Sequence, residues 1–417
     1  MSALEPGLPS FSVVARALRT TTDRLAGEIR APSDVPPDWS RFEWQMARAA
    51  ATMQGCAGLL AAADHWRGAD EWREFLAGQY GQIAAIQDNA RQLLGRIDEV
   101  TRLAGIPCVA LKGSALLALG LLARGTRSMG DVDLLVRPTD TDAIGAALHM
   151  LGYRRGHWSR RHLTYYPPAA GRSLVIGEHR DNPLRIEVHP HISEELPLSQ
   201  VDITSTIWPA DAPPGINRYA SLAALMRHNL LHAAGNIRAR VLRLIQLHDI
   251  AGLARLLGPT DWRELLDRHG EADSAWWLYP PLAFTQRYLP GAIPAKALDA
   301  ARAACPLPLR WCTDRQGLYD VSWSNLRIAA LPGIEWARTP LEAARFARSR
   351  VLPAKVALQE IVDGASNQPG LLSVPWYQIS HFRRILRWIR SRPPRVHTLI
   401  QVRAAAGLGS PCLNRDG

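Results

Sequence analysis

The stretch from Ile106 to Val136 constrains the fold of this 417-residue chain more than any other. It reads IPCVALKGSALLALGLLARGTRSMGDVDLLV: a short apolar run, a Lys-Gly-Ser turn, an apolar helical segment, and a second apolar run that contains Asp131 and Asp133. Short apolar runs bounded by glycine are typical of buried strands. The pattern therefore predicts a strand–helix–strand unit inside a small α/β core.

The two aspartates are predicted to lie on one face of the second strand. Successive side chains of a strand point to opposite faces, so Asp131 and Asp133 point one way while Val132 and Leu134 point into a core. Neighbouring carboxylates repel each other unless positive charge neutralises them. Mg²⁺ (or Mn²⁺) prefers oxygen ligands and binds carboxylates together with substrate phosphates. An isolated Asp-x-Asp pair is more often a solvated turn, but its place behind the Lys-Gly-Ser turn favours a metal site.

The turn before the first predicted helix is suited to binding phosphate. Gly113 allows a ligand to approach the backbone closely, and the start of a helix presents unpaired N–H groups. Ser114 adds a hydroxyl donor, while Lys112 and Arg127 add positive charge. Lys112 is one of only three lysines among the 49 basic residues. We predict a triphosphate–metal complex between this turn and the aspartates; the alternatives are a surface lysine and an arginine that caps a helix.

A third carboxylate follows in the segment LRIEVHPHI. If Ile186 and Val188 face the core, Glu187 faces the side of the aspartates, provided that the two strands are neighbours. Three carboxylates would then hold two metal ions, one for the triphosphate and one that lowers the pKa of an acceptor hydroxyl. That hydroxyl would attack the α-phosphorus, and pyrophosphate would leave. A solvent-facing strand residue is an equally weighted alternative for Glu187.

Several polar residues downstream are predicted to line the acceptor side of the cleft. His228 and His232 are four residues apart on a helix, and we interpret them as packed or substrate-facing histidines instead of zinc ligands. Asp249 lies in an apolar helix, so it must be paired, with Arg243 or one of these histidines. His189 ends the Glu187 strand and is predicted to shape the same pocket.

The order of these motifs resembles the DNA polymerase β-like nucleotidyltransferase superfamily. The segments LKGSALL, GDVDLLV, EVH and HDIAGL resemble, more narrowly, the uncharacterised bacterial nucleotidyltransferase family, over roughly residues 45–290. The resemblance implies that Gly113 and Ser114 form the Gly-Ser signature, that Asp131 and Asp133 bind metal, and that Glu187 is the third carboxylate. It also implies an NTP substrate. The superfamily more often has Asp at the third position and a shorter gap after the Gly-Ser turn.

The predicted fold class is α+β: a small mixed sheet with a polymerase β-like nucleotidyltransferase core, embedded in predominantly helical N- and C-terminal regions. Apolar positions at three-four spacing carry the helical predictions, and residues 163–168 and 173–179 are expected to form a hairpin. We expect five regions: helical at 1–104, the core at 105–192, a helical domain that closes the cleft at 193–292, helical at 293–402, and a disordered tail at 403–417.

Composition restricts the partners and the compartment. The formal net charge of +11 favours anionic partners. Residues 382–395 carry six arginines among apolar residues; a helix docked on the body is favoured, and contact with an anionic surface is the alternative. Five scattered cysteines without a CxxC pair predict reduced thiols. We expect a cytoplasmic protein, because no secretory signal or membrane-spanning window is visible.

These observations predict a metal-dependent nucleotidyltransferase. It would transfer a nucleoside monophosphate from an NTP to a hydroxyl or phosphate of a small-molecule, peptide or protein acceptor. A nucleic-acid acceptor is less expected, because no long nucleic-acid channel is evident. The alternative is a non-catalytic nucleotide- or partner-binding module on the same fold; the presence of both aspartates argues against it.

Overall fold

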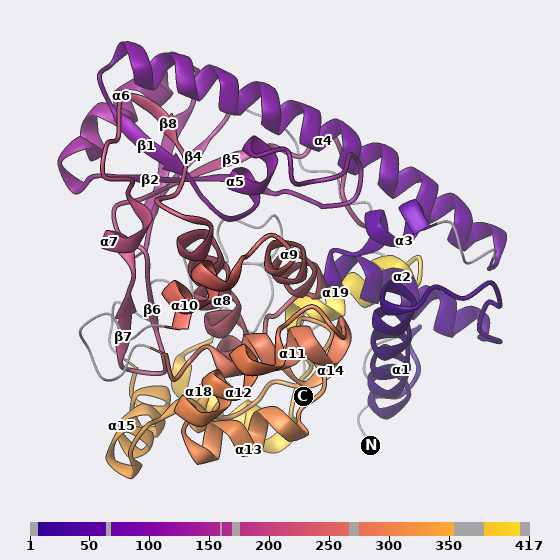
Figure 1. Ribbon diagram of the computed structural model, residues 1–417. Helices are drawn as coiled ribbons and strands as arrows, with labels where there is room; N and C mark the ends of the chain where they lie inside the picture. Colours follow the sequence, from indigo (N-terminus) through magenta and orange to yellow (C-terminus); the bar gives the residue numbers. More distant parts are fainter. Residues whose placement is uncertain are drawn as a thin grey trace.

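A six-stranded mixed sheet lies among helices in the computed structural model, which describes residues 7–63, 68–158, 161–168, 176–266, 275–353 and 379–408 (Figure 1). The strands are β1 (Pro107–Ala110), β2 (Asp131–Val136), β3 (Arg154–Trp158), β4 (Leu163–Tyr166), β5 (Arg185–His189) and β8 (Gly215–Asn217). Their order across the sheet is β3-β4-β5-β2-β1-β8. The arrangement confirms the predicted α+β class.

Pairing within the sheet places β2 and β5 side by side. These two strands are parallel, β1 is antiparallel to β2 and parallel to β8, and β4 is antiparallel to both β3 and β5. The register opposes Asp133 to Glu187, in the middle of the sheet. The strand adjacency that the prediction for Glu187 required is therefore present.

The predicted hairpin between residues 163–168 and 173–179 is wrong. Strand β4 pairs with β3 and β5, residues 176–179 form no strand, and residues 169–175 lie outside the described part of the chain. The physical reason is register: the buried side chains of Leu163 and Tyr165 oppose Val188 and Ile186 on β5. The apolar partner of β4 is therefore β5, which lies further along the chain than residues 173–179.

Each face of the sheet is covered by a different group of helices. The long helix α4 (Asp70–Leu103) and α6 (Thr141–Met150) pack on the face that carries Val132 and Leu134. The opposite face, with Leu135, packs toward α8 (Leu222–Ala239) and α5 (Lys112–Ala118). Figure 1 shows α4 along one side of the sheet and α8 and α9 (Leu244–Ala254) on the other. The Asp131–Asp133 face therefore points toward the helical domain.

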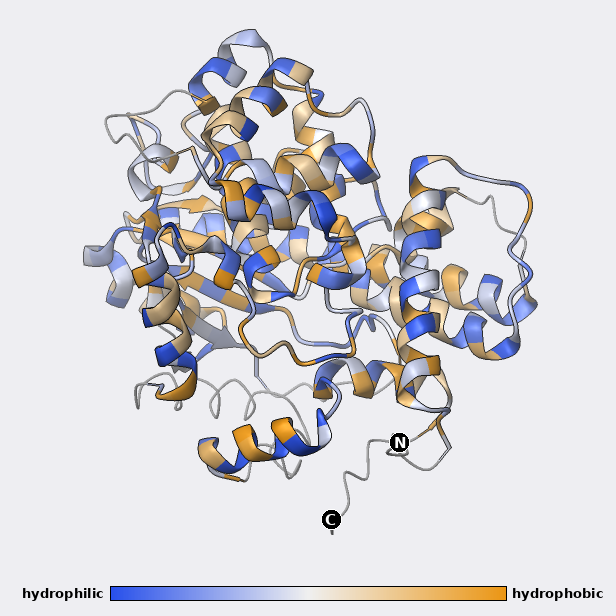
Figure 2. Ribbon diagram, turned by 90° about the horizontal axis from the view of Figure 1, so that it is seen from below, coloured by the Kyte–Doolittle hydropathy of each residue, from blue (hydrophilic) through white to orange (hydrophobic). Residues whose placement is uncertain are grey.

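The remaining elements surround this core. They are α1 (Phe11–Arg30), α2 (Arg41–Gln54), α3 (Ala57–Ala63), β6 (Ser193–Glu195), β7 (Gln200–Asp202), α7 (Thr204–Ile207), α10 (Pro259–Leu266), α11 (Tyr279–Tyr288), α12 (Ala295–Ala304), α13 (Leu307–Arg315), α14 (Leu318–Val321), α15 (Pro340–Val351), α18 (His381–Ser391), α19 (Val396–Ala405), and the 3₁₀ turns Pro138–Asp140 and Ile334–Trp336. Many outer helices alternate hydrophilic and hydrophobic residues (Figure 2).

Among the described residues, no helix is both long and apolar enough to cross a membrane.

Helices α1, α2 and α19, from opposite ends of the described chain, share one small core. Helix α19 packs against α2, and Val14, Leu18, Met46 and Val402 are buried together there. Because α19 continues to Ala405, the expected tail does not begin at residue 403, and residues 409–417 lie outside the described part.

Candidate active site

The three predicted carboxylates converge on one face of the sheet. Asp131 and Asp133 are alternate residues of β2, and Glu187 is directly opposite Asp133 on β5. Asp133 is buried, the Glu187 side chain is 15% exposed, and the Asp131 side chain is 36% exposed. The three carboxylates therefore share one face of the sheet, with Asp133 buried and Asp131 the most exposed of the three.

Positive charge does not fully balance this cluster. The Nζ of Lys112 lies 2.8 Å from Oδ1 of Asp133, and Nη2 of Arg185 lies 4.0 Å from Oδ2 of Asp131. Burial and then repulsion from both aspartates raise the pKa of Glu187 to about 8. Burial and Asp133 raise the pKa of Asp131, whereas Lys112 and His189 overcome burial and hold the pKa of Asp133 well below its usual value.

The Lys-Gly-Ser turn is fixed against the Asp133 strand. Lys112 has a φ of 49°, in the left-handed region, and its backbone N–H donates to Oη of Tyr219 at 3.3 Å. The backbone N–H of Asp133 donates to Oγ of Ser114 at 3.2 Å, and Ser114 is buried. Lys112 and Ser114, two of the four residues predicted to contact phosphate, therefore contact Asp133.

Gly113 provides the space for an arginine. A Cβ at Gly113 would lie 2.2 Å from Nη1 of Arg127, so the guanidinium packs directly on this glycine. The Nε of Arg127 donates to Oδ2 of Asp249 on α9 at 2.8 Å, and both side chains are largely buried. Asp249 is paired, as its burial requires, but the prediction of Arg243, His228 or His232 as its partner was wrong.

Two histidines join Glu187, and one of them was missed in the sequence. The Nε2 of His189 lies 3.0 Å from Oδ1 of Asp133 and 3.8 Å from Oε2 of Glu187. The Nε2 of His162, just before β4, lies 3.6 Å from the same Glu187 oxygen. The signal for His162 was its position next to LTYY, which is informative only once β4 is known to pair with β5. His189 therefore contacts the carboxylate cluster directly, through Asp133.

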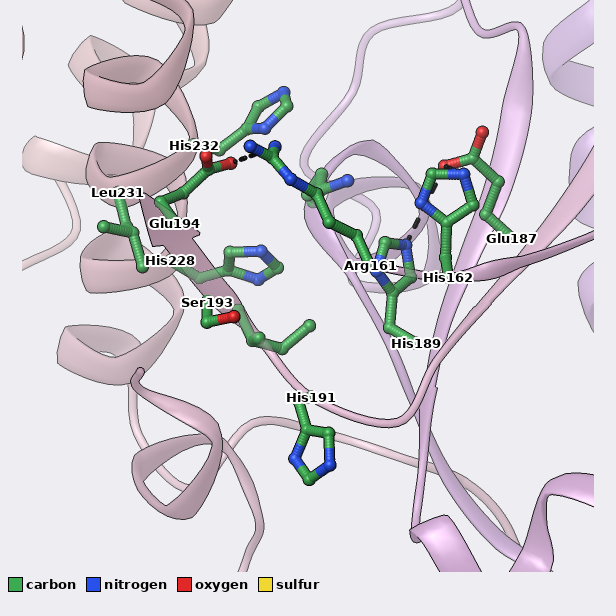
Figure 3. Close-up of a pocket in the computed structure, with 12 residues that line it drawn as sticks. Arg161, His162, Glu187, His189, His191, Ser193, Glu194, His228, Leu231 and His232 are labelled. Carbon is green, nitrogen blue, oxygen red and sulfur yellow. Dashed lines mark hydrogen bonds and ion pairs between the residues drawn. The ribbon is translucent and has the colours of Figure 1, made fainter. Parts of the chain in front are cut away.

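A cavity of about 150 Å³ opens beside these groups (Figure 3). Its lining consists of Lys112, Arg161, His162, Glu187, His189, His191, Ile192, Ser193, Glu194, His228, Leu231 and His232. His228 and His232 reach it from α8, whereas Asp249 is not among the described lining residues. Nδ1 of His228 bonds Oη of Tyr219 at 2.7 Å, and burial lowers the pKa of both helix histidines well below its usual value.

A mixed sheet that presents an Asp-x-Asp pair and a third carboxylate beside a Gly-Ser turn defines the class of polymerase β-like nucleotidyltransferases. The model of a family of uncharacterised nucleotidyltransferases matches residues 36–290, more than half of the 417-residue chain, and the chain belongs to this family. No curated protein and no solved structure matches the chain. The matched range contains every site residue described above.

Proposed function

We propose that the protein transfers a nucleoside monophosphate from an NTP to a small acceptor group in a reaction that depends on Mg²⁺ (or Mn²⁺). The observation that carries the proposal is the opposition of Asp133 and Glu187 across β2 and β5, with Asp131 on the same face. Membership of a nucleotidyltransferase family supports the reaction type.

The residues fit a divalent cation. Three carboxylates face one another with one lysine and one arginine nearby. Burial, and then repulsion from the two aspartates, raise the pKa of Glu187, and a bound cation would offset that repulsion. Asp131, Asp133 and Glu187 would hold the cation. When bound, it would neutralise the triphosphate and lower the pKa of the attacking hydroxyl.

Other side chains of the chain would position the substrates. The ammonium of Lys112 bonds Asp133, so it lies close to the position where the cation would bind and would contact the triphosphate there. Arg127, held on Gly113 by Asp249, would add a second fixed positive charge. His228 and His232 would face the acceptor as neutral rings. The cavity of about 150 Å³ is smaller than the roughly 300–1,000 Å³ typical of ligand pockets, so it suits a small acceptor group.

The test is a transfer assay with labelled NTPs, Mg²⁺ or Mn²⁺, and candidate acceptors, read as a nucleoside monophosphate mass increment. Asp131→Asn with Asp133→Asn should reduce product formation by about 10²–10⁴-fold, because metal catalysis contributes several kcal/mol. Asp142→Asn is the control, since that side chain is 98% exposed on α6. Wild-type activity in a double variant that retains its circular dichroism spectrum and melting transition would reject the proposal.

A non-catalytic nucleotide-binding module is the second candidate. One observation favours it: Oδ1 of Asp133 is already bonded to both Lys112 and His189. Metal-dependent NTP binding by calorimetry, without release of pyrophosphate in any acceptor mixture, would support this alternative over the transferase.

A further inference from the structure

The histidines beside Glu187 make one side of the cluster chemically unlike the other. His162 precedes β4, while Glu187 and His189 lie on β5, and the pairing of Leu163 with Val188 brings them together. The three ligand atoms lie within 4.8 Å of one another. By contrast, Asp131 and Asp133 offer only oxygen. The two nitrogen ligands of the cluster therefore lie beside Glu187, and the aspartates add only oxygen ligands.

We propose that His162, Glu187 and His189 form a binding site for a divalent transition metal. Ligands about 2.1 Å from a tetrahedral metal lie about 3.4 Å apart, and the observed separations from Glu187 are 3.6 Å and 3.8 Å. Shifts of a few tenths of an ångström would bring Glu187 to this spacing from each histidine, and the ligand atoms of the two histidines lie within 4.8 Å of each other.

The donor set selects the class of metal. Imidazole nitrogen suits Zn²⁺, Fe²⁺, Co²⁺ and similar ions, whereas Mg²⁺ prefers oxygen and an octahedral set that keeps several waters. All three residues line the cavity, so a bound ion retains access to water or an acceptor group. Oδ1 of Asp133 lies 3.0 Å from Nε2 of His189 and would become a fourth ligand if its bonds to Lys112 and His189 gave way to the metal. The site thus combines two imidazoles, one or two carboxylates and an open position.

Cobalt binding to the metal-stripped full chain tests this site without any assay of activity. Co²⁺ should bind with one equivalent of high affinity, and its visible absorption bands should persist in excess Mg²⁺. His162→Gln and His189→Gln should each weaken binding by at least about 10-fold, because even partners outside the ligand set affect affinity that much. His191→Gln is the matched control, since His191 lines the same cavity but is exposed and outside the ligand set.

Three outcomes would overturn the site: displacement of Co²⁺ by Mg²⁺, unchanged affinity in both folded histidine variants, or an equal loss in the His191 control. The inference shares Glu187 with the proposed transferase but does not require transfer. Asp131→Asn separates the two proposals, because it should abolish transfer and leave the cobalt bands in place. If the bands persist and wild-type protein transfers nothing, only the proposed function fails.

A second surface is carried by helix α18. Phe382, Leu386 and Ile389 are spaced four and three residues apart, so they form one stripe, and they are 69%, 37% and 59% exposed. The sequence favoured a helix with its apolar face docked on the body. The structure leaves Phe382, Leu386 and Ile389 exposed, whereas Ile385 and Trp388 on the same helix are half-buried. Contacts with the body include Nε1 of Trp388, which donates to the Ile328 carbonyl at 3.0 Å, and Nε2 of His381, which lies 3.1 Å from the Arg350 carbonyl.

We infer that α18 binds the surface of an anionic lipid bilayer. An exposed apolar stripe flanked by cations is typical of helices that lie in the membrane interface. Arg383, Arg387 and Arg390 are exposed on the same helix and complement anionic headgroups. Nucleic acid would use the arginines but leave the apolar stripe unused, so lipid is the better match.

Vesicle flotation tests this surface. The full chain should bind vesicles that contain phosphatidylserine and should not bind pure phosphatidylcholine vesicles. Phe382→Ser with Ile389→Ser should reduce binding at least 10-fold, and Leu307→Ser, at a 65% exposed site on α13, should not. Absence of vesicle binding, binding by the double variant at wild-type strength, or binding of nucleic acid alone would overturn the inference.

Discussion

At the residue scale, the site depends on contacts between side chains that are far apart in the sequence. Arg127 packs on Gly113 and pairs with Asp249, which links the strand–helix turn to α9. A single methyl group at Gly113 therefore reaches an ion pair on a different element.

We predict that Gly113→Ala destabilises the fold, because its Cβ would lie 2.2 Å from Nη1 of Arg127 and 2.6 Å from Cζ. Breaking a buried ion pair costs about 3–5 kcal/mol, and partial movement of the guanidinium would cost less. Urea denaturation measures the change. Gly95→Ala on α4 is the control, since nothing lies within 4 Å of its added Cβ; it should stabilise by about 0.5–1 kcal/mol. Equal effects of the two substitutions would contradict the prediction.

Strand alternation was sufficient to predict that Asp131 and Asp133 share a face, because that periodicity is local. The partner of Asp249 was not predictable, since Arg127 is 122 residues away and burial alone requires only that some partner exists. His162 was missed for a related reason: no local pattern marks a residue that precedes a strand.

At the element scale, the strand–helix–strand unit of β1, α5 and β2 was predicted because each piece is adjacent in the chain. The order of the strands in the sheet was not predicted. The hairpin prediction was wrong because it took the next apolar run in the sequence as the partner of β4, which pairs with β3 and β5. Long-range links between elements are made by buried polar groups that no periodicity reveals. Gln54, at the end of α2, is the clearest of these.

We predict that Gln54→Ala is strongly destabilising. Its Nε2 donates to the hydroxyls of Ser322 and Ser324 at 2.9 and 2.8 Å, and its Oε1 accepts from the N–H of Leu244 at 2.8 Å. Each buried partner left unsatisfied costs about 1–3 kcal/mol. Gln92→Ala, at an exposed position on α4, should change the free energy of unfolding by less than about 0.5 kcal/mol. Similar urea midpoints for both variants would contradict the proposed link.

At the scale of the whole molecule, helices outside the family match complete the fold. Helix α1 precedes residue 36 and α19 follows residue 290, yet both pack with α2 around Val14, Met46 and Val402. Helical character at both ends was predictable from periodicity, but their contact was not, because amphipathic faces do not specify their partners. His397 is half-buried on α19, and its titration gives a test of the assembled protein.

We predict that acid destabilises the fold partly through His397 on α19. Burial, and then Arg395, lower the pKa of His397 to about 4, and its ring contacts Trp323 at 5.3 Å between centroids. The unfolded value is about 6.5, so the unfolded chain binds the proton first as the pH falls. The contribution of His397 to stability is fully present above about pH 6.5 and is lost as the pH falls from there to about pH 4. At pH 5 the loss is about 2 kcal/mol.

The raised pKa values of Glu187 and Asp131 act in the opposite direction, since the folded state then holds protons that the unfolded chain has released. The test is therefore a difference between variants instead of one pH profile. The urea midpoint at pH 7.5 minus the midpoint at pH 5.0, taken with its sign, should be smaller for His397→Gln than for wild type. His149→Gln, at an exposed position on α6, should keep the wild-type separation. An unchanged separation in His397→Gln would show that the assembled molecule tolerates a charge where α19 docks, and the packing at that contact would be looser than its burial indicates.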